Sequence, residues 1–328
     1  MATIYEIART LGLNASTVSR ALRDGQGLAP DTVAAVRAEA RRQGYRPRER
    51  KSAAPRTVAI LCPEVESSFY AKIETALSAR MREAGCSCIL LLTGYDRCRE
   101  AELLRTLPDR GVSGILCLTE SRDLGPELEA CIRDREVPVV QIGMSVPTGN
   151  YDNVRVDEEE GIRAAMDHLT GLGHRHIAFL GGRFCRARLE FFQAAAECIG
   201  IAGSCSVLTA DDVGFSCGYA LAGKLLAANG DATAVVAEYD GMALGVIRRL
   251  KEAGLDVPGD VSVVGFDDAA YCGYLSPALT TIRSHTESMC EIASEMLLRK
   301  LRDPSHQTVR NILIRPELIV RESTGAAK

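Results

Sequence analysis

Apolar side chains recur at the 3.6-residue spacing of amphipathic helices in three short stretches near the N-terminus. The three stripes are Ile4, Ile7, Ala8 and Leu11; Val18, Ala21 and Leu22; and Val33, Val36 and Ala40. Thr3 followed by Glu6 predicts a capping box at the start of the first helix, and Pro30 is predicted to open the third. Gly12 and Gly44 stand where helix ends favour glycine. The pattern therefore predicts three short helices in one compact unit.

From Thr57 onward, short apolar runs alternate with amphipathic stretches. The predicted strands are 57–61, 88–92, 114–118, 137–142, 176–180, 205–208, 234–237 and 261–266. The amphipathic stretches between them include 69–84, 158–172, 215–228 and 240–253. This alternation predicts parallel sheets with helices on both faces, and such sheets bind ligands beyond the carboxyl ends of their strands. The chain is therefore expected to have a small all-α unit followed by an α/β core.

The second predicted helix carries small and hydroxyl side chains at its front and arginines behind them. Asn14 is expected to cap this helix, which then reads Ala15, Ser16, Thr17, Val18, Ser19 and Arg20. Small residues let the helix backbone approach a DNA groove, hydroxyls reach phosphates, and an arginine can donate two hydrogen bonds to guanine. A helix-turn-helix that reads the major groove has this composition. An ordinary helical hairpin is the alternative.

The charge distribution separates the two parts of the chain. Residues 1–56 hold 11 Lys or Arg against 5 Asp or Glu, whereas the whole chain of 328 residues has a net charge of −4. A basic head with a net charge of +6 therefore precedes a body with a net charge of −10. The head is expected to be attracted to phosphate, and its DNA binding to weaken with salt.

Neither membrane nor export signals are found. No apolar run approaches the ~20 residues of a membrane-spanning helix, and the N-terminus lacks the apolar segment of a signal peptide. The chain has 12 cysteines, several in apolar patterns, such as Cys62, Cys117 and Cys198. They are interpreted as reduced thiols of a cytoplasmic protein.

Catalytic and cofactor motifs are also missing. The sequence has no Gly-x-Ser-x-Gly, no His-Glu-x-x-His, no phosphate-binding loop and no dinucleotide fingerprint. His174 and His176 lack a third nearby metal ligand, so His174 is expected to brace a turn instead. We therefore expect no enzyme activity, no cofactor and no metal.

Several motifs together resemble the LacI/GalR family of transcriptional regulators over nearly the whole chain. The N-terminal motifs are 4–22 and Gly44-Tyr45-Arg46-Pro47, and the core motifs are 168–182, 257–268, 276–282 and 315–323. The resemblance implies a helix-turn-helix headpiece (1–47), a linker (48–56) and a two-lobed core like a periplasmic binding protein. One lobe would comprise 57–156 and 284–316, and the other 157–283 and 317–328. The segment 151–157 is most similar to galactose- or galactoside-responsive members.

The resemblance also implies the binding residues. The DNA-contacting set is Thr3, Asn14, Ala15, Ser16, Thr17, Ser19, Arg20, Arg23, Tyr45 and Arg46. The effector-contacting set is Phe69, Tyr70, Gly143, Arg188, Tyr239, Asp267 and Ser284. In this set Asp267 would accept hydrogen bonds from sugar hydroxyls and Arg188 would hold the ligand from the far side. Tyr239 occupies a position where the family usually has Asn, and Asp240 is expected to cap the following helix.

The linker departs from the family pattern. Many members wedge a leucine of this segment into the minor groove, but this chain has no leucine between Gly44 and Leu61. Arginines 46, 48 and 50 are expected either to follow the minor groove or to belong to a flexible tether.

These expectations combine into one function. The protein is predicted to be a repressor of a sugar-utilisation operon that binds a pseudo-palindromic operator as a homodimer and is released by a small sugar. An activator, or a regulator with a non-sugar corepressor such as a purine, is the main alternative. A sugar-binding protein without regulatory function is a further one.

Overall fold

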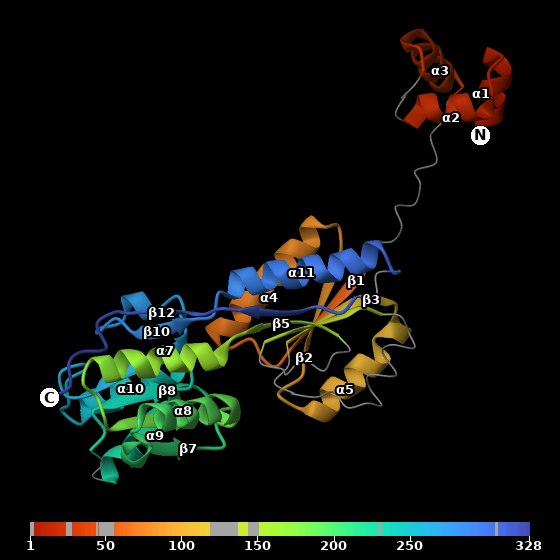
Figure 1. Cartoon of the computed structure of the whole chain (residues 1–328). Helices are drawn as coiled ribbons and strands as arrows, with labels where there is room; N and C mark the ends of the chain where they lie inside the picture. The colour runs from red at the N-terminus through yellow and green to blue at the C-terminus, as the bar shows by residue number, and fades with distance from the viewer. Residues whose placement is uncertain are drawn as a thin grey trace. The chain divides into compact units, whose positions relative to one another are not determined.

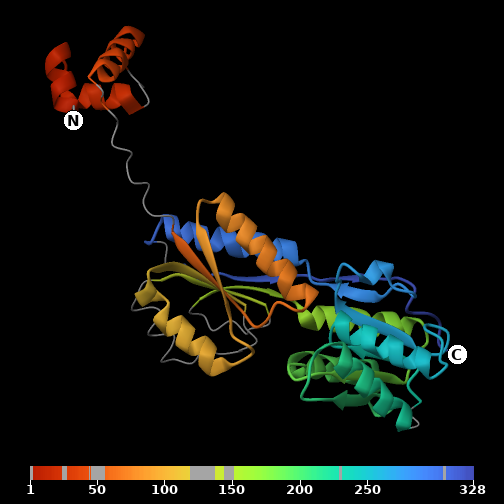
Figure 2. The same cartoon turned by 180° about the vertical axis from the view of Figure 1, so that it is seen from behind.

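The computed structural model describes residues 3–23, 28–43, 45, 56–118, 137–143, 151–228, 231–305 and 308–328. The chain divides into two compact units, Met1–Pro55 and Arg56–Lys328 (Figures 1 and 2). We call the first the headpiece unit and the second the core unit, and each is described by itself.

The headpiece unit contains α1 (Ile4–Leu11), α2 (Ala15–Arg23) and α3 (Pro30–Arg42). The predicted capping box is confirmed, since Thr3 and Glu6 satisfy each other's backbone donors. Gly12 ends α1 with a φ of 65°, as predicted. The apolar stripes meet in a small core of Ile7, Ala8, Val18, Ala21, Val36 and Ala40. Gly44, the predicted end of the third helix, lies outside the described residues.

The first sheet of the core unit has the order β11-β5-β4-β3-β1-β2, and its strands are parallel. Its strands are β1 (Thr57–Cys62), β2 (Ser87–Leu92), β3 (Val112–Leu118), β4 (Val139–Ile142), β5 (Asp152–Val156) and β11 (Asn311–Ile314). Successive side chains of β1 point to opposite faces. Ile60 packs in one apolar cluster with α4 (Ser68–Glu83) and α11 (Thr286–Arg302). Leu61 packs in another with α5 (Arg97–Thr106).

The second sheet has the order β12-β10-β9-β8-β6-β7, parallel except for β12 against β10. Its strands are β6 (Ile177–Gly181), β7 (Ser206–Thr209), β8 (Ala234–Ala237), β9 (Ser262–Asp267), β10 (Thr280–Arg283) and β12 (Glu317–Ile319). One face packs against α7 (Glu158–Gly171) and α8 (Arg186–Ile199). The other packs against α9 (Gly214–Ala227) and α10 (Asp240–Glu252).

The chain passes between the two sheets three times. It leaves the first sheet after β5, returns after β10, and crosses again between β11 and β12. Three short 3-10 helices complete the described elements: η1 (Pro108–Arg110), η2 (Ala202–Ser204) and η3 (Cys272–Tyr274).

All eight predicted strands are present, and so are the helices predicted at 69–84, 158–172, 215–228 and 240–253. The sequence pattern missed β5, β10, β11 and β12, because polar side chains interrupt or bound their apolar runs. β5 begins with the buried polar residues Asp152 and Asn153, and β10 begins with Thr280 and Thr281.

Two of the three cysteines that the sequence analysis placed in apolar patterns are buried. Cys62 and Cys117 are buried as expected, but Cys198 is exposed, because it lies on the outer side of α8. Every cysteine in the described part of the chain is a free thiol. Among the described helices, none combines the length and the apolar character needed to cross a bilayer.

Candidate functional site

The predicted DNA-contacting residues of α2 lie on its outer side. Val18 and Ala21 are buried in the headpiece core, whereas Ser16 and Arg20 are exposed. Asn14, directly before the helix, is also exposed, and Ala15, Thr17 and Ser19 are half-buried. The headpiece is further fixed by a hydrogen bond of 3.1 Å from Gln43 Nε2 after α3 to Thr10 Oγ1 on α1. α2 thus presents a polar face and packs its apolar face against the other two helices.

Other predicted DNA-contacting residues have structural partners. The Thr3 hydroxyl donates to Glu6 Oε2 at 3.0 Å within the capping box. Tyr45 packs against the headpiece core, and its N–H donates to the carbonyl of Ala40 at 2.8 Å. Arg46, the linker arginines 48 and 50, and the Arg23 side chain lie outside the described residues.

In the core unit, Arg188 near the start of α8 is buried and surrounded by acidic groups. Its Nε donates to Glu158 Oε1 at 2.7 Å, and its Nη1 donates to the carbonyl oxygen of Glu238. Its Nη2 lies 3.8 Å from Asp267 Oδ1, and its guanidinium carbon lies 3.8 Å from the centre of the Phe266 ring. Burial alone would lower the pKa of Arg188, but the nearby carboxylates outweigh it and raise the pKa. Arg188 therefore remains charged.

Asp267 is the last residue of β9, and its carboxyl group lies beside Arg188. Its Oδ1 accepts a hydrogen bond of 3.0 Å from the hydroxyl of Ser284, which is the first residue after β10. The backbone of Asp267 has a φ of 106°, which side-chain-bearing residues rarely adopt. Burial raises the pKa of its carboxyl, while Arg188 opposes that rise. The structure thus brings together three predicted residues, Arg188, Asp267 and Ser284.

Sequence reasoning missed two acidic members of this cluster, Glu158 and Glu238. Glu158 opens α7 and pairs with Arg188, and both side chains are buried. Glu238 follows β8, and its Oε2 accepts a hydrogen bond from the Gly182 N–H. Burial raises the pKa of Glu238. The signals in the sequence were a run of three glutamates at 158–160 and an acidic residue directly before Tyr239. We call Arg188, Glu158, Glu238 and Asp267 the acidic cluster.

Tyr239 and Asp240 lie at the start of α10, and only the expected capping role of Asp240 differs from the structure. The Tyr239 hydroxyl accepts a hydrogen bond from the Gly214 N–H, so the ring contacts the start of α9. The prediction that Asp240 caps its helix was wrong, because Tyr239 is the N-cap residue. The Asp240 carboxylate instead accepts hydrogen bonds from the Ala269 N–H at 2.7 Å and from the Thr281 hydroxyl. Burial, reinforced by the charge of Asp267, raises its pKa to about 7.

Two of the predicted effector-contacting residues lie in an aromatic cluster. Phe69 and Tyr70, at the start of α4, meet edge to face with ring centroids 5.2 Å apart. Tyr70 also contacts Tyr95, whose ring stacks on Phe184 at 4.6 Å. Phe184 follows β6, so this stack joins segments that follow strands of the two different sheets. Sequence reasoning missed Tyr95 and Phe184, because neither belongs to a motif.

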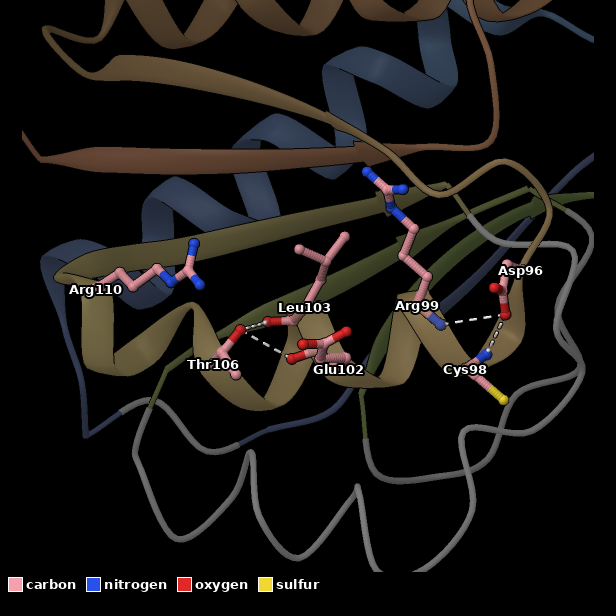
Figure 3. Close-up of a pocket in the computed structure, with 7 residues that line it drawn as sticks. All are labelled: Asp96, Cys98, Arg99, Glu102, Leu103, Thr106 and Arg110. Atoms are coloured by element: carbon pink, nitrogen blue, oxygen red, sulfur yellow. Dashed lines mark hydrogen bonds between the residues drawn. The ribbon is translucent and has the colours of Figure 1, made fainter.

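Gly143 follows β4 and has a φ of 114°. Its N–H donates to the carbonyl of Val154 at 3.0 Å, so its described hydrogen bond is to β5. A hollow of about 440 Å³ lies elsewhere on this unit, along α5 (Figure 3). Its lining residues are Asp96, Cys98, Arg99, Glu102, Leu103, Thr106 and Arg110, none of which belongs to the predicted set.

His174 braces a turn, as predicted. Its Nδ1 lies 2.8 Å from Thr233 Oγ1, and its Nε2 lies 3.0 Å from both Ser262 Oγ and the Gly325 carbonyl. The imidazole therefore ties the turn after α7 to β9 and to the C-terminal segment. Burial lowers its pKa and favours the neutral ring.

Comparisons with known proteins agree with this architecture. Residues 166–324 match the family described as periplasmic binding protein-like domain. The chain is 30% identical over 335 residues to the HTH-type transcriptional repressor PurR of Vibrio cholerae serotype O1 (strain M66-2), with 98% of each chain covered. It is 28% identical to the transcriptional regulator CelR in its cellobiose complex, covering 98% of this chain and 100% of that one with a TM-score of 0.70. The lac repressor dimer bound to operator and the anti-inducer ONPF has the same fold, with 24% identity, 99% of each chain covered and a TM-score of 0.77.

Proposed function

Because this chain belongs to the LacI family of transcriptional regulators, we propose that it represses a sugar-utilisation operon and that a small sugar releases it from the operator. Its relatives are regulators, and the chain is not an enzyme. In this proposal residues 1–47 bind DNA and 48–56 link them to the sensor. Residues 57–156 with 284–316 form one lobe of the sensor, and 157–283 with 317–328 form the other.

The polar face of α2 supports the DNA-binding half of the proposal. Exposed Ser16 and Arg20 are of the types that contact phosphates and guanine edges, and the headpiece core holds the helix behind them rigid. Arg20 is the proposed base contact. The proposed role of Asn14, Ala15, Thr17 and Ser19 is to position the helix in the DNA groove. A single headpiece reads only a few base pairs, so we propose a homodimer on a pseudo-palindromic operator.

The acidic cluster is the observation that carries the effector half. One guanidinium lies near the acidic side chains of Glu158, Glu238 and Asp267, so acidic side chains outnumber basic ones. Such a site disfavours phosphorylated or carboxylate ligands and favours ligands rich in O–H donors, which a neutral sugar supplies. Asp267 and Ser284 are the proposed hydroxyl contacts, and Arg188 lies between the carboxyl groups of Glu158 and Asp267. Phe69, Tyr70, Gly143 and Tyr239 are the proposed walls of the site.

A mobility-shift titration of the full chain on its upstream DNA tests the proposal. D-galactose, lactose, cellobiose, D-ribose and hypoxanthine are added in turn. We expect one of the sugars to weaken operator binding. Failure of a wide sugar panel to change operator affinity would remove the sugar from the proposal, and tighter binding with hypoxanthine would support a corepressor instead.

Two variants assign the response to the site. Asp267→Asn is expected to keep operator binding and lose the sugar response. Asp260→Asn, which removes a surface ion pair with Lys328 at 2.7 Å, serves as the matched control and should retain both. An unchanged sugar response in Asp267→Asn would exclude Asp267 as an effector contact.

A further inference from the structure

Two consecutive aspartates at the end of β9 have left-handed backbone conformations. Asp267 has a φ of 106° and Asp268 a φ of 55°. Outside glycine, such conformations are unfavourable and persist only where surrounding contacts hold them. The contacts of Asp268, which the effector proposal does not use, therefore bear on where Asp267 lies.

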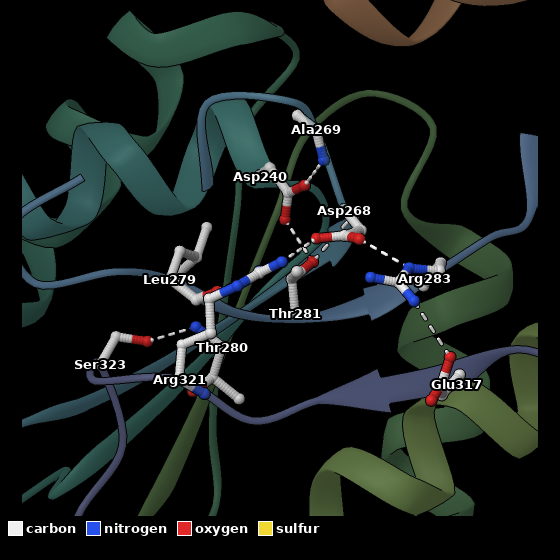
Figure 4. Close-up of polar contacts among 10 residues, drawn as sticks. All are labelled: Asp240, Asp268, Ala269, Leu279, Thr280, Thr281, Arg283, Glu317, Arg321 and Ser323. Carbon is white, nitrogen blue, oxygen red and sulfur yellow. Dashed lines mark hydrogen bonds and ion pairs between the residues drawn. The ribbon is translucent and has the colours of Figure 1, made fainter. Parts of the chain in front are cut away.

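Two arginines hold the carboxylate of Asp268 (Figure 4). Arg283 Nε donates to Oδ2 at 2.7 Å, and Arg321 Nη2 donates to Oδ1 at 2.6 Å. The Asp268 N–H also donates to Thr281 Oγ1 at 3.3 Å. The Asp268 side chain is only 11% exposed, so both pairs are shielded from water on that side. Two donors on opposite oxygens fix the carboxylate in position and orientation.

These arginines stand beside the crossings between the sheets. Arg283 is the last residue of β10, directly before the chain returns to the first sheet. Its Nη1 also pairs at 3.2 Å with Glu317, the first residue of β12 after the third crossing. Arg321 lies two residues beyond β12. The end of β9 is thus tied directly to the second crossing through Arg283, and through the Arg283–Glu317 pair to the third.

A weaker pair extends the chain of contacts to the first crossing. Arg315 Nη2, between β11 and β12, lies 2.9 Å from Glu160 in the first turn of α7. Its side chain is 83% exposed, so water screens this pair and its contribution is small. Loss of the Asp268 carboxylate should therefore loosen residues 281–286 and 317–321 strongly, and its effect should decrease towards Glu160.

We propose that Asp268 is a positioning residue that couples Asp267, in the proposed effector site, to the crossings between the two lobes. A ligand that moves the end of β9 moves the Asp268 carboxylate, and the two arginines follow it because they are hydrogen-bonded to its two oxygens. The crossings are the segments that connect the two sheets, so any rotation of one lobe against the other must change their backbone conformation. The inference rests on the proposed function, but its structural part can be tested without effector or DNA.

Hydrogen exchange of the full chain, followed by mass spectrometry, tests this coupling. Asp268→Asn keeps a residue that tolerates the left-handed conformation and removes the charge, whereas Asp268→Gly relieves the backbone cost and removes the carboxylate. We expect both variants to speed exchange at 281–286 and 317–321. Asp260→Asn, which breaks an ion pair of the same lobe, should leave those segments unchanged.

Faster exchange confined to 266–270, or wild-type exchange in Asp268→Gly, would overturn the proposal, because Asp268 would then serve only its own turn. Arg283→Met keeps Asp268 and the Arg321 pair, and should speed exchange at 267–269 and 317–321; it replaces the Asp268 variants if they fail to fold. Operator affinity of Asp268→Asn is expected to change about 2–30-fold, the range for a residue that modulates coupling. A chain that binds no operator but shows the distant exchange effect would refute the proposed function and retain the coupling.

Discussion

Three aspartates within 29 positions show that environment, rather than residue type, decides what a carboxyl group does here. Asp240 is buried among neutral donors and has its pKa raised to about 7. Asp267 is also buried, but it faces Arg188 and Ser284. For Asp268, burial would raise the pKa, but hydrogen bonds from Arg321 and Arg283 outweigh it and keep the carboxyl ionised. The residues proposed to contact DNA differ again, because their side chains lie on an exposed helix face.

Arg20→Ala tests that helix face. If Arg20 donates to a base edge, its loss should reduce affinity for the operator by ~1–3 kcal/mol and leave affinity for random duplex nearly unchanged. Fluorescence anisotropy with both duplexes measures the difference. Equal losses on the two would show that Arg20 contacts phosphate only.

Asp240→Asn tests the buried carboxyl. A pKa raised from 3.8 to about 7 means that the folded state holds a proton that the unfolded chain releases. The stabilising contribution is complete below the unfolded pKa and is lost as the pH rises through the folded pKa. The free energy of unfolding should therefore fall by roughly 2–3 kcal/mol between about pH 5 and about pH 8 because of this group. Urea unfolding at both pH values measures it, and the decline should be smaller by that amount in Asp240→Asn. An identical decline in the two proteins would contradict the assignment.

At the scale of elements, close helix packing supports the second sheet. α9 and α10 approach so closely that a Cβ on Gly218 would lie 2.1 Å from the Met242 carbonyl oxygen. A Cβ on Gly245 would lie 2.1 Å from the Phe215 carbonyl oxygen. Backbone atoms cannot swing aside as a flexible side chain does, so both positions exclude any larger residue. The periodicity of the sequence predicted both helices but not their distance, because that distance depends on two glycines 27 positions apart meeting in space.

Gly245→Ala should therefore destabilise the core by ~1–3 kcal/mol, the usual cost of overpacking, even though alanine favours helix more than glycine. Gly171→Ala is the matched control: Gly171 ends α7, a methyl group added to it would meet no atom within 4 Å, and the change should be neutral or slightly stabilising. Denaturant unfolding of both variants gives the comparison. Equal stability of Gly245→Ala and wild type would mean that α9 and α10 separate without cost.

At the scale of the whole molecule, the two units differ in charge. The basic head and the acidic remainder are separate along the chain, so a net charge of −4 does not prevent binding to a polyanion. The acidic remainder also disfavours contact of DNA with the core unit. The proposed DNA binding would then depend on the charge of the headpiece unit, while the proposed effector site is buried within the core unit.

Salt should therefore weaken DNA binding much more than effector binding. Affinity for any duplex is expected to fall by on the order of 10³ or more between about 50 and about 200 mM salt if six or more phosphates are contacted. Effector affinity, measured by calorimetry over the same range, should change little, since buried pairs are screened weakly. Salt-independent DNA binding would contradict a basic headpiece as the contact.

The sequence alone determined what depends on neighbours along the chain: the three headpiece helices, the capping box, eight strands and the order of strands and helices that implies parallel sheets. It also determined the family, since the motifs lie in contiguous stretches. Tertiary structure alone decided the surroundings of Arg188, because Glu158 and Glu238 lie 30 and 50 positions from it and meet it only when α7, α8 and β8 pack. The same holds for the Tyr95–Phe184 stack and for the two arginines on Asp268. Local pattern fixes backbone conformation through hydrogen bonding and periodicity, whereas the charge and contacts of a buried group depend on which distant segments exclude water around it.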